Sequence, residues 1–197
     1  MVHCFAFVNT VAYGYAMNTV KLTRDDWLAA GFLALSQEGP TALRAEALAR
    51  KLKTTKGSFY WHFADLPAFK QAMLTLWREK VASEIIAEVM EEEDKHKRLE
   101  LLIKNAAEPP PDEYGGRKIE TAMRAWALSD PIVFSALDEM DQLRLGFVSS
   151  LLKDMGQDDP ALAQLVYGAY VGLDDLSSKD KADIGPALEK LLALLSK

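Results

Sequence analysis

The chain has 197 residues, of which 49% are hydrophobic and 26% charged, and its net charge is −6. These values are typical of an ordinary globular protein, and they exclude low-complexity and collagen-like chains. A single cysteine, Cys4, excludes an intramolecular disulfide and fits a reducing compartment. The histidines, His3, His62 and His96, lack the spacing of a zinc site, so we expect neither a metal nor a cofactor.

Charge is distributed unevenly along the chain. Residues 21–63 carry seven Lys or Arg against four Asp or Glu, whereas residues 64–197 carry 16 basic against 25 acidic residues. A basic segment followed by an acidic one indicates two parts with different tasks, and a basic patch is the usual footprint of nucleic-acid binding. The predicted division is an apolar tail at 1–20, a DNA-binding domain at 21–66 and a larger domain at 67–197.

The apolar tail has no charged residue. It lacks the basic start and cleavage pattern of a signal peptide, and Asn and Thr residues interrupt it, so it makes a poor membrane span. We therefore expect a cytoplasmic protein without a membrane anchor. Two alternatives stay open: a membrane tether formed by this tail, and a true start at Met17 that leaves residues 1–16 outside the natural protein.

From Thr23 onward apolar residues recur at helical spacing, and no segment alternates as a strand would. Thr23 with Asp26 resembles a capping pair, and Gly39-Pro40 ends the first helix. An Asp that can cap a helix, followed by a proline in the first turn, occurs at residues 65–67 and again at residues 130–131. The pattern predicts an all-α protein with about nine helices. The first helix is expected to begin near residue 23. The other eight are expected to span about residues 43–51, 56–62, 65–89, 96–107, 117–129, 130–155, 159–173 and 183–195.

Two short helices joined by a tight turn, with basic residues at the second, predict a helix-turn-helix whose second helix enters the DNA major groove. Thr54 and Thr55 place hydroxyls at the start of that helix, where free N–H groups favour phosphate. Lys56 adds a cation, and Gly57 removes side-chain bulk where DNA approaches closely.

The run of rings at residues 59–63 is predicted to have two roles. Phe59 and Phe63 lie four residues apart and can anchor the helix to the core, while Ser58, Tyr60 and Trp61 project outward. The alternative is that all five rings are packing residues. The predicted DNA-binding residues are Arg44, Lys53, Thr54, Thr55, Lys56, Gly57, Ser58, Tyr60, Trp61 and His62.

The segment LARKLKTTKGSFYWHFADLPAFKQAML resembles the DNA-binding signature of TetR-type transcriptional regulators. The matching residues are Thr55, Gly57, Ser58, Phe59, Tyr60, His62 and Phe63. A weaker similarity covers RAWALSDPIVFSALDEMDQLRLGFVSSLLKDMG, which looks like the effector-domain core of one branch of the family. Two positions depart from the pattern: Lys53 replaces a turn glycine, and Leu66 replaces a lysine. The phosphate contact associated with that lysine is either lost or taken over by Lys70.

The resemblance implies a C-terminal domain that binds a small effector and forms a homodimer. Two apolar rows near the C-terminus independently favour pairing with a symmetry mate, although they are also compatible with packing inside one subunit. The expected dimer residues are Leu162, Leu165, Val166, Ala169, Leu173, Leu188, Leu191, Leu192 and Leu195. The expected effector-binding residues are Trp77, Met123, Trp126, Phe134 and Phe147.

Together these features predict a non-enzymatic, ligand-responsive repressor that binds palindromic double-stranded DNA as a dimer and is released by an unidentified small molecule. The alternative is an all-helical ligand-binding protein or enzyme whose basic N-terminal segment binds an anionic group instead of DNA. The sequence offers no nucleophile–base pair and no phosphate-binding glycine loop in support of that alternative.

Overall fold

A computed structural model describes residues 22–180 and 183–195, so the apolar tail at residues 1–20 lies outside the described part of the chain. The described residues form ten α-helices and no strand, which confirms the all-α prediction. The helices are α1 (Arg24–Glu38), α2 (Ala45–Lys51), α3 (Lys56–Tyr60), α4 (Leu66–Arg78), α5 (Glu84–Glu91), α6 (Lys95–Ala107), α7 (Ile119–Ala127), α8 (Pro131–Asp154), α9 (Pro160–Asp180) and α10 (Gly185–Leu195). Short 3₁₀ turns occupy Pro40–Ala42, Asp112–Tyr114 and Gly116–Lys118.

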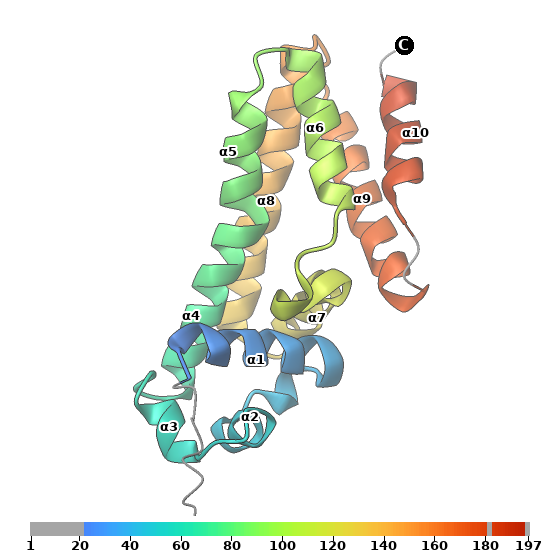
Figure 1. The fold of residues 1–197 in the computed structure, drawn as a ribbon. Helices are drawn as coiled ribbons and strands as arrows, with labels where there is room; N and C mark the ends of the chain where they lie inside the picture. The colour runs from blue at the N-terminus through green and yellow to red at the C-terminus, as the bar shows by residue number, and fades with distance from the viewer. Residues whose placement is uncertain (1–21, 181–182, 196–197) are drawn as a thin grey trace, which may run out of the picture.

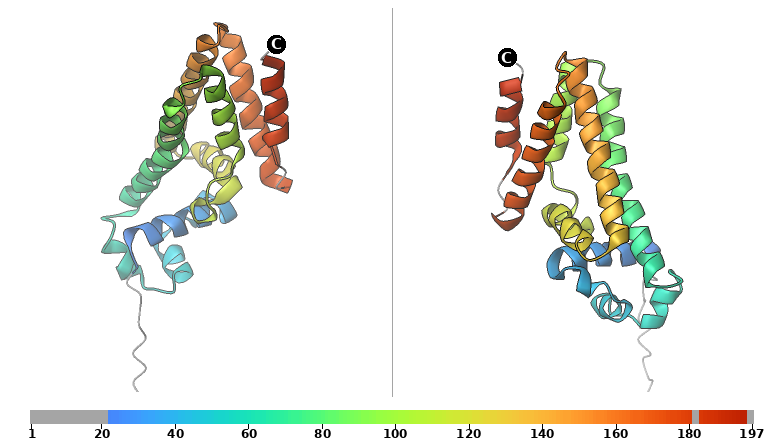
Figure 2. Two further views of the ribbon diagram at one scale, coloured as in Figure 1. Left: turned by 45° about the horizontal axis from the view of Figure 1, so that its top comes forward. Right: turned by 180° about the vertical axis from the view of Figure 1, so that it is seen from behind.

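The helices are arranged as a small head below an elongated body (Figure 1). In the head, α1 crosses above α2 and α3, and α7 lies on the other side of α1. A column formed by α4 and α5 runs from the head to the far end of the molecule, with α8 beside it. Figure 2 shows from two further directions that α9 and α10 lie along one side of the body.

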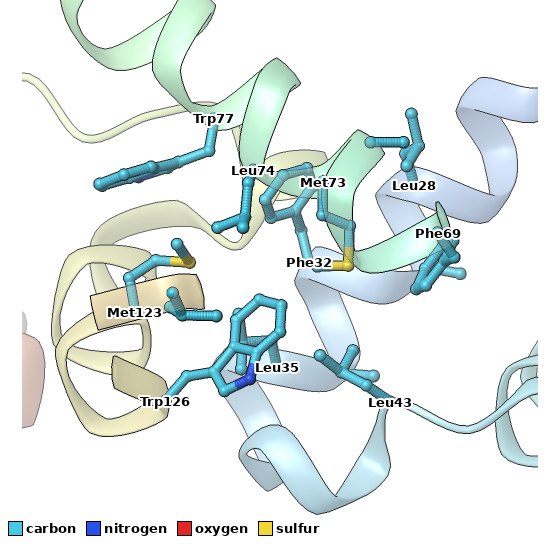
Figure 3. Packing of buried hydrophobic residues seen from close by; sticks show 14 of the residues in the cluster. Leu28, Phe32, Leu35, Leu43, Phe69, Met73, Leu74, Trp77, Met123 and Trp126 are labelled. Atoms are coloured by element: carbon cyan, nitrogen blue, oxygen red, sulfur yellow. The ribbon is translucent and has the colours of Figure 1, made fainter. Parts of the chain in front are cut away.

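The first hydrophobic core joins the head to the lower half of the body. It contains Trp27, Phe32, Phe59 and Trp77 together with residues of α7 and of the first turns of α8. Figure 3 shows α1, α4 and α7 contributing side chains to this one cluster. The core therefore runs across the predicted domain boundary at residue 66, and α4 and α7 pack directly against the head.

Close approach of α1 to α4 depends on Gly31. A Cβ atom at this position would lie 2.6 Å from Phe69 Cζ and 2.9 Å from Met73 Sδ, distances that side chains do not tolerate without displacement. Glycine therefore sets the spacing at which the first helix of the head rests on the long column.

A second core fills the upper body. Residues from α5, α6, α8, α9 and α10 form it, including Val89, Leu99, Leu152, Val166 and Leu188.

Two helix boundaries differ from the prediction. The expected single helix over residues 65–89 is interrupted by a π-helical segment, Glu79–Ser83. This segment contains no Gly or Pro from which an interruption could be predicted. The helix expected to end at residue 173 continues to Asp180. Its polar end is compatible with the helix because the buried Ser177 and Ser178 hydroxyls donate to the carbonyls of Asp174 and Asp175 at 2.9 and 2.7 Å.

Within residues 22–180 and 183–195, no helix is both long enough and apolar enough to cross a membrane.

The turn between α2 and α3 has a strained residue. Lys53 has a φ of 53°, and it is the one non-glycine residue with a positive φ in the described chain. We expect Lys53→Gly to raise the free energy of unfolding by about 1 kcal/mol, because a left-handed conformation is unfavourable for residues with a Cβ. Urea unfolding measures the change.

Lys104→Gly, at an exposed position inside α6, is the matched control and should lower stability, since glycine weakens a regular helix. Equal destabilisation by both substitutions would show that the turn stores no strain.

Candidate nucleic-acid interface and effector cavity

The short helix α3 is fixed at its start by a cap. Thr55 has an extended backbone, and its Oγ1 accepts a hydrogen bond from the Ser58 N–H at 3.4 Å. This bond occupies one of the free N–H groups of the first turn, as expected for a threonine cap. Asp65 caps the following helix in the same way, by accepting from the Ala68 N–H at 2.7 Å.

The inner face of α3 is aromatic. Phe59 is completely buried and its ring lies 5.3 Å from the rings of Trp27 and Phe69, edge to face with both. Phe63, which follows the helix, is 4% exposed and packs edge to face on Phe69 at 5.0 Å. A helix of five residues is far too short to be stable alone, so these contacts determine its position.

The outer face of α3 is open to solvent. Trp61 is 88% exposed and Tyr60 is 49% exposed, so the five rings of the run do not all pack in the core. Lys56 and Gly57 are exposed and Ser58 is partly exposed. A Cβ atom at Gly57 would meet only Thr55 Oγ1, at 3.7 Å, which leaves the surface clear for an approaching molecule.

The other predicted DNA-binding residues surround this face. Arg44 and Lys53 are exposed at the two ends of α2, Thr54 lies in the turn, and His62 is partly exposed beyond the end of α3. The guanidinium of Arg24 lies 5.2 Å from the centre of the Phe63 ring and adds a cation that the sequence pattern gave no reason to select.

Lys56 is not a free cation. Its Nζ forms an ion pair with Glu46 of α2, and this hydrogen bond raises the pKa of Lys56 above its usual value. The ammonium also lies 5.8 Å from the centre of the Tyr60 ring. Sequence reasoning missed Glu46, because ten residues separate it from Lys56 and the helix-turn-helix brings them together.

Polar contacts join α4 to the body. Lys70 pairs with Asp130, the cap of α8, at 3.2 Å, and Arg78 pairs with Glu139. The ammonium of Lys70 also lies 5.5 Å from the centre of the Trp126 ring. In this structure the partly exposed Lys70 is therefore engaged with Asp130 and Trp126, and its predicted phosphate contact stays a prediction.

A cavity of about 390 Å³ lies in the body. Its wall includes Trp77 of α4, Glu120 of α7, Arg144 of α8 and Tyr170 of α9, and the loop that follows α6 forms its outer side. A second, apolar cavity of about 90 Å³ lies between α5, α6 and α8–α10 and shares Arg144 and Tyr170 with the first. The larger volume falls in the range of small-molecule sites.

The predicted effector residues are distributed between core, cavity and surface. Trp77 lines the larger cavity and Phe147 the smaller one. Met123 and Trp126 are each 1% exposed and line neither cavity, because both point into the first core against α1 and α4 (Figure 3). Phe134 lies 61% exposed on α8. Helical spacing alone did not distinguish core aromatics from cavity aromatics.

A buried ion pair forms the floor of the larger cavity. Arg144 donates two hydrogen bonds to the Glu120 carboxylate, at 3.0 and 2.9 Å, and Trp77 Nε1 donates a third at 3.3 Å. Burial alone would raise the pKa of Glu120, but the Arg144 charge outweighs it and keeps the pKa below its usual value. Glu120 therefore links α4, α7 and α8 through one carboxylate.

Asp174 of α9 also faces the larger cavity. Burial raises its pKa to about 6, and the nearby Glu120 carboxylate acts in the same direction. The charges of Arg117, Arg144 and Arg124 oppose the shift without cancelling it. This carboxyl group is ionised at neutral pH in surroundings that disfavour its charge.

The predicted dimer residues are only partly available to a partner. Val166 and Leu188 are buried in the second core of their own subunit, because helical spacing marks an apolar row without showing which neighbour covers it. Four others, Leu162, Leu173, Leu191 and Leu192, are partly buried against the same core. Ala169 is partly exposed, and the side chain of Leu195 lies outside the described residues.

The outward face of α9 is formed by a row that shares Leu165 with the predicted set. Leu165 is 68% and Leu176 is 61% exposed. Between them lie Gly168 and Gly172, above which no atom comes within 4 Å of an added Cβ. This row is apolar and narrow, and it permits close approach of another helix.

No group of three or more His, Cys, Asp or Glu side chains suited to a metal ion occurs within the part of the chain that the structure describes.

The raised pKa of Asp174 predicts a pH-dependent stability effect. A carboxyl group with a higher pKa in the folded than in the unfolded protein destabilises the fold when ionised, above about pH 6, and ceases to do so near pH 4. We expect Asp174→Asn to raise the Tm at about pH 7.5 and to lose this advantage at about pH 4. Thermal unfolding at both pH values measures it.

Asp175→Asn is the matched control, because Asp175 does not line this cavity and accepts a hydrogen bond from Thr121. A Tm gain for Asp174→Asn that is the same at both pH values would contradict the assignment of a buried charge.

Residues 28–65 match the family model of bacterial regulatory proteins of the tetR family. No curated protein sequence matches the chain. Among solved structures, the reduced form of NemR from E. coli superposes with a TM-score of 0.65 at 21% identity, covering 87% of this chain and 94% of that one. A protein from Rhodococcus sp. described as a TetR-family transcriptional regulator gives a TM-score of 0.66 at 19% identity, covering 87% of this chain and 95% of that one.

A transcriptional regulator from Rhodococcus sp. Rha1 gives a TM-score of 0.67 at 16% identity, covering 89% of this chain and 94% of that one. At these identities the superpositions establish the fold, and the family match establishes the character of the N-terminal segment. Residues 28–65 thus form a TetR-family helix-turn-helix DNA-binding domain, and the chain has the all-helical fold of TetR-type transcriptional regulators.

Proposed function

We propose that the protein is a ligand-responsive repressor that binds a palindromic operator as a homodimer and leaves it when a small molecule binds the body. The observation that carries this proposal is the division of α3 into a buried aromatic face and an exposed polar face. A helix held in this way can enter a major groove without rearranging its own core. The exposed Lys56 and Tyr60 and the partly exposed Ser58 are the residues we assign to DNA contact.

The ion pair between Lys56 and Glu46 has a role in this proposal. A carboxylate beside the groove-facing cation repels phosphate, and DNA must replace it as the partner of Lys56. Weak, exposed ion pairs are easily exchanged in this way. The pair therefore lowers affinity for DNA in general while keeping Lys56 near its functional position.

Release by an effector follows from the position of the larger cavity. Trp77 lines this cavity and belongs to α4, which also carries Phe69 of the first hydrophobic core. A ligand that displaces Trp77 from its hydrogen bond with Glu120 moves α4, and the head moves with it. The ligand acts on DNA binding only if it prefers the displaced arrangement, and the difference in its two affinities sets the size of the response.

The outward row of α9 is the surface we assign to the dimer. Gly168 and Gly172 allow two copies of α9 to approach closely, and Leu165 and Leu176 supply apolar surface on either side. Closed two-fold pairing is the commonest form of oligomer, and a two-fold protein matches a palindromic site. The two α3 helices would then lie one helical turn of DNA apart, about 34–36 Å.

Operator binding is tested by fluorescence anisotropy on the DNA upstream of the gene, at several salt concentrations. We expect a preference for an inverted repeat and a steep loss of affinity with added salt, since each phosphate contact releases a counterion. Binding that ignores both sequence and salt would refute the proposed function.

Two substitutions at the α3 surface should act in opposite directions. Lys56→Ala is expected to weaken binding to all DNA sequences and to reduce the salt slope by about one, because one phosphate contact is lost. Glu46→Gln is expected to strengthen binding, because it removes the competing carboxylate. Anisotropy titrations measure both.

Lys97→Ala, at an exposed position of α6 remote from the head (Figure 1), is the control and should leave binding unchanged. A Glu46→Gln protein that bound DNA more weakly would mean that the carboxylate supports the interface instead of opposing it.

The dimer surface is tested at Leu165. Leu165→Asp should yield a folded monomer, because the side chain is exposed in the single subunit but its charge would be buried unpaired in the dimer. Light scattering coupled to size exclusion gives the mass. Leu128→Asp is the control, since Leu128 is 89% exposed at the end of α7 and does not belong to the α9 row.

The control protein should retain the mass and operator affinity of the wild type. A Leu165→Asp protein that remained dimeric would place the interface elsewhere.

A further inference from the structure

We infer that the effector is a compact organic cation, such as an amine or a quaternary ammonium compound, held in the larger cavity by Asp174 and by aromatic rings. This inference rests on the proposed function, because it names the chemical class of ligand for the proposed effector site. It is carried by the charges and the rings that line the cavity.

Two basic residues of the cavity lining are already neutralised by carboxylates. Arg144 is committed to Glu120 by two hydrogen bonds beneath the cavity. Lys80, which belongs to the π-helical segment, pairs with Glu84 at 2.6 Å. Neither of these basic residues offers an uncompensated positive charge to an anionic ligand.

The remaining charged residues of the lining are one guanidinium and three carboxylates. Arg117 is the guanidinium, and Glu108, Glu113 and Asp174 are the carboxylates. Glu108 and Glu113 are exposed near the outer side, whereas Asp174 is partly buried. The lining therefore carries an excess of negative charge, which attracts cations to the opening and disfavours anions inside.

The walls also suit a cation. Trp77, Tyr114 and Tyr170 line the same cavity as Asp174. The negative faces of aromatic rings attract cations, and rings gathered around a site are the usual way of holding quaternary ammonium groups. The Arg144 guanidinium already lies 5.9 Å from the centre of the Trp77 ring, so this ring carries one such contact in the free protein.

The position of Asp174 makes it the residue on which affinity depends. Its carboxylate is ionised at neutral pH although burial disfavours the charge. A bound cation would relieve that unfavourable state, whereas an anion would worsen it. The adjoining apolar cavity, about 90 Å³ and reached beside Tyr170, has room for a short alkyl group only.

The test uses three probes of similar shape and different charge. They are trimethylphenylammonium, its neutral isostere tert-butylbenzene and the anion benzenesulfonate, each titrated into the full-length protein by ligand-observed NMR. We expect the cation to bind about tenfold or more tightly than the neutral isostere, and the anion to bind most weakly.

Two variants locate the site. Asp174→Asn should weaken cation binding about tenfold and leave binding of tert-butylbenzene unchanged, since only the charge interaction is removed. Loss of binding would not reflect unfolding, because this substitution is expected to stabilise the protein at neutral pH. Asp175→Asn, one residue along α9 and outside the lining, should bind the cation like the wild type.

The inference is overturned if benzenesulfonate binds best, if the cation binds no better than tert-butylbenzene or not at all, or if Asp174→Asn binds the cation as tightly as the wild type. Operator binding without any probe is measured in parallel and tests the proposed function separately. A cation that binds at Asp174 without changing DNA affinity would uphold the site and refute release by an effector. A protein that binds operator DNA but does not bind the cation would refute this inference without refuting operator binding.

Discussion

The packing of Phe59 and Phe63 against Trp27 and Phe69 is the constraint on which the rest of the structure depends. A helix of five residues gains too little from its own hydrogen bonds to persist, and replacing a buried phenylalanine by alanine typically costs about 3–5 kcal/mol. The ring contacts therefore both stabilise the head and fix which side of α3 faces outward. An exposed surface of defined orientation is what recognition of a DNA groove requires.

The same core explains how the body can act on the head. Phe69, which packs on Phe59, and Trp77, which lines the larger cavity, lie two turns apart on α4. Lys70 and Arg78 fasten that helix to α8, and Trp77 fastens it to Glu120. In the proposed response, a change at the cavity would reach α3 through this one helix. The π-helical segment directly beyond Arg78 marks the place where this helix departs from regular geometry.

Much of the fold could be predicted from sequence, because capping residues and helical spacing act locally. Thr23 and Asp26 form the expected capping box, and Asp65 and Asp130 cap the helices that they were expected to start. The tetR-family character of residues 28–65 was likewise visible in the residues around Gly57. The π-helical segment was not predictable, because its hydrogen-bond shift leaves no mark in side-chain type.

The site was less predictable, since it depends on contacts between distant residues. Glu46 meets Lys56 only after the turn has formed, and Glu120, Arg144 and Asp174 meet only when three helices assemble. Met123 and Trp126 had the residue types of a ligand site and lie in the core instead. The apolar rows of α9 and α10 were visible, but which side of α9 faces its own subunit depends on the packing of α7 and α8.

The central claim is that the exposed side of α3 is the surface that enters DNA. Hydrogen exchange measured by mass spectrometry, on the free protein and on its operator complex, tests this claim most directly. The account predicts that amides of residues 55–62 become strongly protected when operator DNA is added. Protection confined to other segments, with residues 55–62 exchanging as in the free protein, would contradict it.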